Sequence, residues 1–245
     1  MKKLSERAAE NRVDLTIHAL TVTGILAGMA SLIGVLNSEP IRAIVWMMLA
    51  VVIDGIDGPI ARRWMTELEV PRFDGYTLDL VIDYVTCVLV PCAFMWQFNV
   101  VNHGIIGQFT IAGVLGSAAL WFSQTNMETE DHWFKGFPAA WNLVIPTLWL
   151  LGQRPEFNIL VCVGLSLLTL SEVQFPHTIR VGRFRYANVA VTIVWMTSLI
   201  VLSFHADQVN NAERLLLLVA PVTIGTMVMV HELETKRATA KQTTL

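Results

Sequence analysis

The sequence predicts an all-α fold, a polytopic integral membrane helix bundle that forms a single domain over residues 1–245. Three observations predict it. Only 15% of the residues are charged and 54% are hydrophobic, whereas soluble domains carry about 25% charged residues. The mean hydropathy is high, at +0.54. The apolar residues also gather in runs of about 20, which is the length of a helix that crosses a bilayer.

Eight apolar runs are each expected to form a transmembrane helix, and the fifth of them is short. Polar and turn-forming residues separate the runs, as in Asn37–Pro40 and Asp207–Asn211. The runs are Val13–Leu36, Ile41–Arg62, Leu78–Val100, Ile105–Ser123, Phe137–Gly152, Phe157–Phe175, Ala187–Ala206 and Ala212–Val230.

The basic residues indicate which way the bundle lies in the membrane. An even number of spans places both chain termini on one side, and that side carries fourteen of the 17 Lys and Arg residues. Only Arg42, Arg154 and Arg214 belong to the other side. Because Lys and Arg concentrate in cytosolic loops, we expect both termini in the cytosol.

Residues 1–12 are too polar for the apolar region of a signal peptide. They predict a short amphipathic juxtamembrane helix that lies on the lipid surface. The net charge is -3, and the basic residues form no stripe of the kind that binds nucleic acid. We therefore expect membrane lipids, and not nucleic acid, as partners.

Four aspartates inside the predicted spans are the strongest candidates for a functional site, because ionisable residues within a membrane are costly and usually functional. Asp54 and Asp57 lie near the end of the second span, and Asp79 and Asp83 at the start of the third. Each pair has helical spacing and shares a helix face. Asp54 lies roughly 20 Å along its helix from Ile41, so we expect both pairs at one depth near the cytosolic edge.

Divalent cations are expected to hold this cluster together, because four carboxylates in a medium of low dielectric constant repel one another. Oxygen ligands favour Mg²⁺ or Mn²⁺, and these ions leave coordination positions for phosphate oxygens. Gly55 and Gly58 leave room for a ligand beside the helix. Arg62, one turn after Gly58, can bind a phosphate or pair with the carboxylates.

Two other readings of the aspartates remain open. They could pair with nearby arginines to fix helix packing, or they could form the cation site of a cation-coupled transporter. A transporter predicts polar residues across the whole membrane, whereas Ile41–Ile53 and Val85–Trp96 are almost wholly apolar. That pattern favours a site on one side of the membrane.

The segment that begins DGIDGPIAR at Asp54, followed by Gly75, Asp79 and Asp83, resembles the signature of the CDP-alcohol phosphotransferase family. That signature reads D-x-x-D-G-x-x-A-R, a spacer, and G-x-x-x-D-x-x-x-D, and every fixed position is present. The spacer Arg63–Asp74 is longer than usual. This spacer, the eight spans, and residues 78–86 and 135–142 are similar to the bacterial phosphatidylcholine synthase branch of the family.

The resemblance implies transfer of the phosphatidyl group from CDP-diacylglycerol to choline, which gives phosphatidylcholine and CMP. It implies two Mn²⁺ or Mg²⁺ ions, with Asp54, Asp57 and Asp79 as ligands. Asp83 would be the general base and could also touch a metal ion. Contacts with CDP-diacylglycerol are implied for Gly58, Ala61, Arg62, Gly75 and Thr21.

The resemblance also implies a homodimer in the bacterial inner membrane, with the active site on the cytosolic side. Nothing in the chemistry of the residues identifies choline as the acceptor. Serine, glycerol 3-phosphate and inositol therefore remain alternative acceptors for the same reaction.

Two further groups of residues are candidates for substrate binding. Three arginines form a basic loop on the cytosolic side that could bind phosphate, although positive-inside topology or contact with anionic lipids would also explain it. Aromatic faces and a carboxylate recognise a quaternary ammonium such as choline, but each such candidate could also be an ordinary interfacial residue. The phosphate candidates are Arg180, Arg183 and Arg185, and the choline candidates are Tyr84, Trp141 and Glu172.

Overall fold

The fold is described from a computed structural model, which describes residues 19, 21–64 and 74–243. The side chains at positions 57, 58, 61–64 and 238–243 are outside that description. The juxtamembrane helix predicted for residues 1–12 lies outside the described residues.

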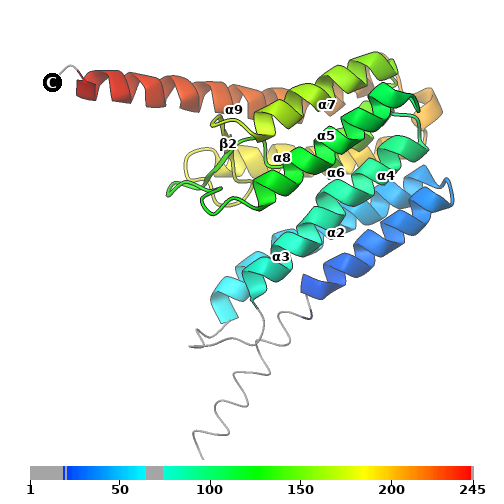
Figure 1. Ribbon diagram of the computed structural model, residues 1–245, viewed down its shortest axis with the longest axis horizontal. Coiled ribbons are helices and arrows are strands. Elements are labelled where there is room, and N and C mark those ends of the chain that lie inside the picture. Colours follow the sequence, from blue (N-terminus) through cyan, green and yellow to red (C-terminus); the bar gives the residue numbers. More distant parts are fainter. Residues whose placement is uncertain (1–18, 20, 65–73, 244–245) are drawn as a thin grey trace, which may run out of the picture.

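Each of the eight apolar runs contains a helix in the described part of the chain, and these helices form the bundle in Figure 1. Three helical segments, α3, η1 and α4, follow one another without a break. The helices span Thr21–Leu36, α2 Pro40–Trp64, α3 Gly75–Asp83, η1 Tyr84–Leu89, α4 Val90–Gln97, α5 Ile105–Phe122, α6 Trp141–Leu151, α7 Pro155–Thr169, α8 Arg185–Ser203 and α9 Asn211–Thr243, with a short 3₁₀ helix η2 Ala206–Gln208.

Four of these helices are long and apolar enough to cross a membrane: Gly75–Gln97, α5, α8 and the Asn211–Arg237 part of α9. Large apolar side chains are also exposed on these helices and on the shorter α7. Phe109, for example, is 72% exposed and Leu160 is 69% exposed. Contiguous apolar surface of this kind suits a lipid environment and not water. The predicted class, an all-α membrane protein, is therefore confirmed.

Connections at one end of the bundle are short and tie neighbouring helices together. Gln97 Nε2 donates a hydrogen bond to Ser38 Oγ over 2.8 Å, and Asn158 Nδ2 donates to the carbonyl of Val100, also over 2.8 Å. The predicted minority of arginines lies at this end: Arg42 and Arg214 are in the first turns of α2 and α9, and Arg154 directly precedes α7. The loops at the other end are longer and carry most of the polar contacts.

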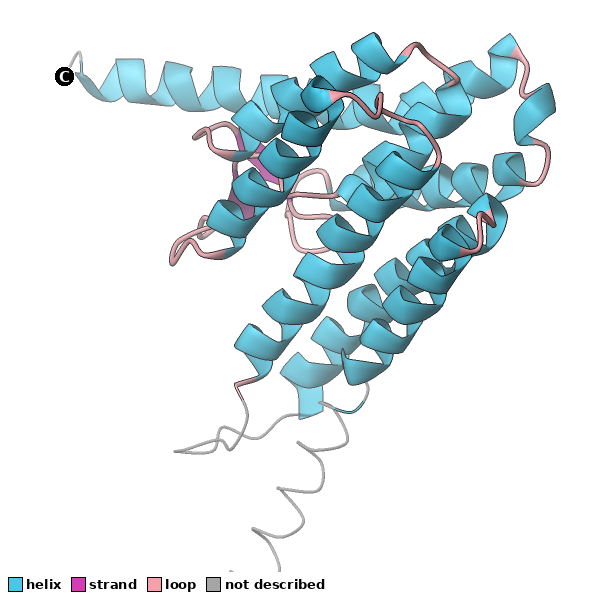
Figure 2. Ribbon diagram, turned by 45° about the vertical axis from the view of Figure 1, so that its right-hand side comes forward, coloured by secondary structure: helices cyan, strands magenta, loops and turns pink. Residues whose placement is uncertain are grey.

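A two-stranded antiparallel sheet occupies that second end, where only helices and loops were predicted. Strand β1 (Trp133–Lys135) pairs with β2 (Gln174–Pro176), and Figure 2 shows both strands beside α9. The predicted sixth span, which ran to Phe175, is therefore too long. Pro176 disfavours helical geometry at the residue before it, and α7 ends at Thr169.

The fifth span is also shorter than predicted, because α6 begins at Trp141 and not at Phe137. Gly136 and Ala139 have positive φ angles of 83° and 51°, which an α-helix does not accommodate. A Cβ at position 136 would lie 2.2 Å from the carbonyl oxygen of Thr169. Glycine is required there because the chain passes so close to the end of α7.

The first helix packs closely against the helix that carries Asp79 and Asp83. A Cβ at Gly24 would lie 3.3 Å from Cγ2 of Ile82, and one at Gly28 would lie 2.9 Å from Cγ2 of Thr86. Glycines four residues apart allow helix backbones in a membrane to approach in this way. The approach fixes the position of α3 and η1 against the rest of the bundle.

A π-helical segment, η1, follows directly after Asp83. Pro91 lies just beyond it, and a proline ring crowds the carbonyl four residues earlier and cannot donate a hydrogen bond. The wider π turn accommodates this residue, and single π turns of this kind often occur at functional sites. The π turn also rotates the residues after Asp83 relative to the helix face that carries the aspartates.

We expect the substitution Gly28→Ala to strain the contact between the first helix and η1. The added Cβ would meet the Thr86 side chain, and such overpacking typically costs about 1–3 kcal/mol. Thermal unfolding in detergent should therefore occur at a lower temperature. Gly113→Ala in α5 is the matched control, because a Cβ there has no described atom within 4 Å. An unfolding temperature of Gly28→Ala at or above that of the control would contradict this packing.

Candidate metal centre

Three aspartates from two helices meet at the end of the bundle that carries the longer loops. Asp54 lies on α2, and Asp79 and Asp83 lie one turn apart on α3. Each offers a carboxylate oxygen, and these oxygens all lie within 4.8 Å of one another. Asp54 is exposed, whereas Asp79 and Asp83 are half-buried. The cluster is therefore accessible from outside the bundle.

The start of α3 is fixed by its own cap. The Asp74 carboxylate accepts hydrogen bonds from the backbone N–H of Tyr76, over 3.1 Å, and from the Thr77 hydroxyl, over 2.5 Å. The hydrogen bond from Thr77 lowers the pKa of Asp74 below its ordinary value, so the capping carboxylate stays ionised at neutral pH. An N-cap of this kind sets where a helix begins, and here it sets the depth of Asp79 and Asp83.

A narrow hollow contains the three carboxylates and continues between the first helix, α2 and α3. Thr21, a predicted substrate contact, lines this hollow and so lies beside the aspartates. The apolar residues that line this hollow were not predicted, because nothing in the sequence distinguishes them from ordinary core residues. The lining residues from outside the aspartate pairs are Thr21, Gly24, Ala50, Ile53, Ile82 and Thr86.

The cluster has the chemistry of a site for a hard divalent cation. Two carboxylate charges 4.8 Å apart repel each other by roughly 3 kcal/mol at an effective dielectric constant of 20. An ion bound at about 2.1 Å from each oxygen bridges ligands up to about 4.2 Å apart, and paired ions bridge more. The oxygen-only ligand set and its spacing therefore fit Mg²⁺ or Mn²⁺.

The remaining residues of the predicted signature are only partly described. Gly75 is the first residue of α3. The predicted ligand Asp57 and the predicted substrate contacts Gly58, Ala61 and Arg62 all belong to α2, but their side chains lie outside the described residues.

The three choline candidates lie in different environments. The Tyr84 hydroxyl donates a hydrogen bond to the carbonyl of Leu115 over 3.1 Å, so it faces α5. Trp141 is fully buried and packs edge-on against Phe137. The prediction that Glu172 lies within the sixth span is wrong, because α7 ends before it and Glu172 is exposed in the following loop.

The loop that carries Arg180 and Arg183 approaches α2 through Ile179. Cδ1 of Ile179 lies 3.8 Å from where a Cβ would stand at Gly55, the residue after Asp54. The next residue, Arg180, pairs with Glu128 over 3.0 Å. Arg183 instead pairs with Glu234 of α9. Arg185 is exposed at the start of α8.

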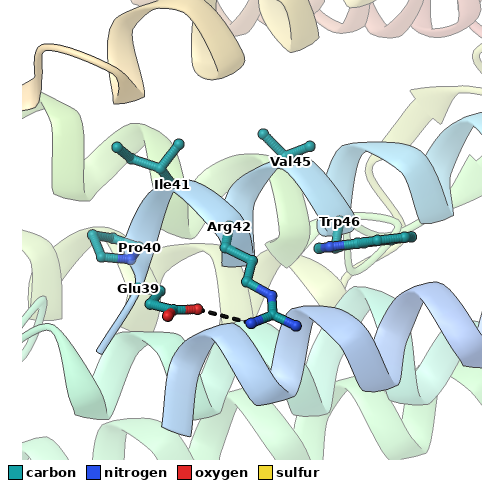
Figure 3. A pocket seen from close by; sticks show the side chains of 6 residues that line it. All are labelled: Glu39, Pro40, Ile41, Arg42, Val45 and Trp46. Atoms are coloured by element: carbon teal, nitrogen blue, oxygen red, sulfur yellow. Dashed lines mark hydrogen bonds and ion pairs between the residues drawn. The ribbon is translucent and has the colours of Figure 1, made fainter. Parts of the chain in front are cut away.

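A second hollow lies at the opposite end of α2 and has mostly apolar walls (Figure 3). Its charged members, Glu39 and Arg42, form an ion pair over 3.0 Å. Arg42 precedes Asp54 by roughly 18 Å along the helix, so this hollow is separate from the aspartates. Its lining residues are Glu39, Pro40, Ile41, Arg42, Val45 and Trp46.

The amino-acid sequence matches the family model for CDP-alcohol phosphatidyltransferase over residues 16–224. It is 36% identical to the phosphatidylcholine synthase of Pseudomonas aeruginosa, over 74% of this chain and 76% of that protein. It is 34% identical to the phosphatidylcholine synthase of Mesorhizobium japonicum, over 79% of this chain and 75% of that protein. The phosphatidylcholine synthase of Rhizobium meliloti is 36% identical over 74% of each chain. The family match includes the whole aspartate cluster.

We expect Asp79→Asn to weaken the binding of Mn²⁺ to the purified protein by roughly tenfold or more, because it removes one of the clustered charges that attract the ion. Electron paramagnetic resonance of free Mn²⁺ in a titration measures this affinity without any turnover. Asp207→Asn, an exposed aspartate in η2 at the other end of the bundle, is the matched control. Equal affinities in the two variants would argue against a metal centre here.

Proposed function

The chain belongs to the CDP-alcohol phosphatidyltransferase family, and we infer that it makes phosphatidylcholine by transferring the phosphatidyl group of CDP-diacylglycerol to choline. It is therefore a transferase of phospholipid biosynthesis. The observation that carries this function is the aspartate cluster, which lies at one end of an apolar bundle. A membrane-embedded donor with a charged diphosphate needs a charged site at the membrane edge.

In the proposed mechanism the choline oxygen attacks the phosphorus that bears diacylglycerol, in line with the leaving group. A new P–O bond forms there, the P–O bond to the CMP phosphate breaks, and CMP leaves. Asp83 accepts the proton of the choline hydroxyl, since that alcohol is a poor nucleophile without a positioned base. Asp54, Asp57 and Asp79 would hold two Mg²⁺ or Mn²⁺ ions, which would neutralise the diphosphate and stabilise the leaving CMP.

We propose that the diphosphate of the donor binds at the aspartates, where this narrow hollow begins. Thr21 lines that hollow, which supports its predicted contact with the nucleotide end of the donor. Gly58, Ala61, Arg62 and Gly75 are assigned to the same substrate on the family signature alone.

We propose that the protein crosses the bacterial inner membrane eight times as a single domain, with both termini and the aspartates on the cytosolic side. Support comes from the uneven distribution of Lys and Arg and from a helix in each apolar run. The homodimer and the choline contacts of Tyr84, Trp141 and Glu172 rest on the sequence alone. Glu172 is exposed in a loop, whereas Trp141 is fully buried.

We expect purified protein with CDP-diacylglycerol and Mn²⁺ to release CMP when choline is added. A metal chelator should abolish the release, and Asp83→Asn should lower kcat by about 100-fold or more, since a general base contributes typically 10²–10⁴. The experiment offers choline, serine, glycerol 3-phosphate and inositol separately.

CMP release with an alcohol other than choline would keep the chemistry and overturn the acceptor. If no alcohol gives metal-dependent CMP release, the proposed enzymatic function is wrong, and cation transport through the aspartates is favoured instead.

A further inference from the structure

The structure separates the three arginines of the basic loop from one another. Arg183 is held by Glu234 of α9, and Arg185 projects from α8. Arg180 directly follows Ile179, whose side chain reaches α2 beside Asp54. Of these three residues, Arg180 is therefore the one next to a residue whose side chain contacts α2 beside Asp54.

The backbone around Arg180 is held rigidly. His177 Nδ1 accepts the backbone N–H groups of Ile179 and Arg180, over 3.2 Å and 3.4 Å. The His177 ring also stacks on Phe134, with centroids 5.0 Å apart. Asn188 Nδ2 donates a hydrogen bond to the His177 carbonyl over 3.3 Å. The turn that presents Arg180 is thus fixed to β1 and to α8.

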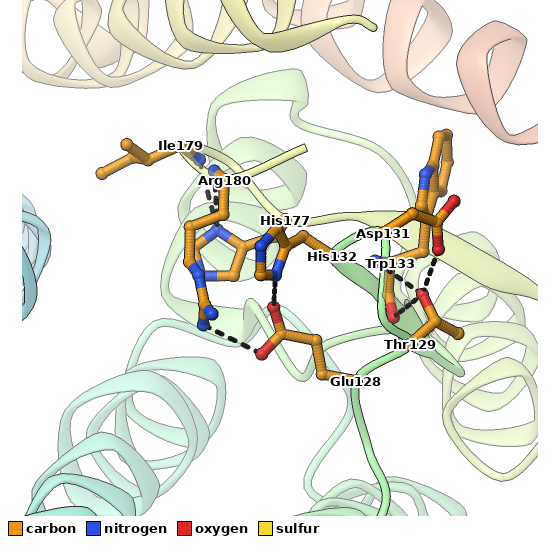
Figure 4. Close-up of polar contacts among 8 residues, drawn as sticks. All are labelled: Glu128, Thr129, Asp131, His132, Trp133, His177, Ile179 and Arg180. Atoms are coloured by element: carbon orange, nitrogen blue, oxygen red, sulfur yellow. Dashed lines mark hydrogen bonds and ion pairs between the residues drawn. The ribbon is translucent and has the colours of Figure 1, made fainter. Parts of the chain in front are cut away.

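Glu128 fixes the guanidinium of Arg180 as well. One carboxylate oxygen accepts from Nη1 of Arg180 over 3.0 Å, and the other meets Nδ1 of His132 over 2.6 Å. Figure 4 shows the Glu128 carboxylate between these two groups. The Glu128 side chain is 24% exposed and that of Arg180 is 33% exposed. A guanidinium has five N–H donors, so one bond to Glu128 leaves the fork able to bind a second anion.

We propose that Arg180 binds a phosphate of the CDP-diacylglycerol diphosphate, and that Glu128, supported by His132, is a positioning residue that holds Arg180 in place. The proposal rests on the proposed function only for the identity of the donor. Arginine suits this role because its planar fork matches phosphate oxygens. An ion pair of this exposure adds little to stability by itself, whereas an ordered arginine loses less freedom when it binds a ligand.

We expect Glu128→Gln to weaken donor binding and leave the acceptor unaffected. The KM for CDP-diacylglycerol and its Kd without an acceptor should both rise about three- to tenfold, the effect of freeing one ordered side chain. The KM for choline and kcat should change less than about twofold. Glu130→Gln is the matched control, because Glu130 is an exposed carboxylate two residues away in the same loop.

A double-mutant cycle tests whether Glu128 acts through Arg180. Arg180→Ala should raise the Kd for CDP-diacylglycerol at least as much as Glu128→Gln does. Adding Glu128→Gln to Arg180→Ala should then change that Kd by less than about twofold, because coupled residues are not additive. Equal effects of Glu128→Gln with and without Arg180 would overturn the proposal. A lower unfolding temperature of Glu128→Gln with an unchanged Kd would also overturn it.

The same experiments separate this proposal from the proposed function. The acceptor is identified by CMP release from the wild-type protein with each alcohol. The role of Arg180 is judged from the Kd for CDP-diacylglycerol, which is measured in the presence of Mn²⁺ with no alcohol present. If the wild-type protein binds the donor but transfers the phosphatidyl group to another alcohol, the role of Arg180 stands and the assignment of choline as the acceptor is wrong.

Discussion

Repulsion among three carboxylates held within 4.8 Å of one another is the constraint on which the rest of the structure depends. Such a cluster at the edge of an apolar bundle needs rigid elements to hold it, and its repulsion is relieved by a bound cation or by protonation. Both halves of the cluster lie on helices. Asp74 caps α3, and the first helix packs closely against α3 at Gly24 and against η1 at Gly28. Sites built on helices are held more precisely than sites on loops.

The two ends of the bundle differ because only one of them carries the site. The far end needs little more than turns and helix caps. The near end adds the β1–β2 sheet, which α9 holds from one side: His231 stacks on Trp133 with centroids 3.7 Å apart and bonds to Gln174 over 2.7 Å. These contacts join segments that are far apart in sequence. They give the polar loops at this end of the bundle a fixed shape.

The donor and the acceptor make different demands on this arrangement. A diphosphate attached to two acyl chains must enter from the membrane and meet cations and fixed positive groups. Choline carries a permanent positive charge and needs aromatic or acidic surroundings. The aspartates, their hollow and the Arg180 loop are the described features on which the proposed donor site rests. The three choline candidates do not share one environment. The assignment of choline as the acceptor therefore rests on the similar phosphatidylcholine synthases.

The sequence by itself determined what depends on local periodicity. Apolar runs of bilayer length predicted the helices. The pairs Asp54/Asp57 and Asp79/Asp83 predicted an acidic site, because residues three or four apart share a helix face and both pairs were expected at one depth. The tertiary structure decided what depends on contacts between distant segments. It placed Gln174–Pro176 in a strand, turned Tyr84 toward α5, left Glu172 in a loop and paired Arg180 with Glu128, 52 positions earlier. No local pattern specifies such partners, because the fold alone brings them together.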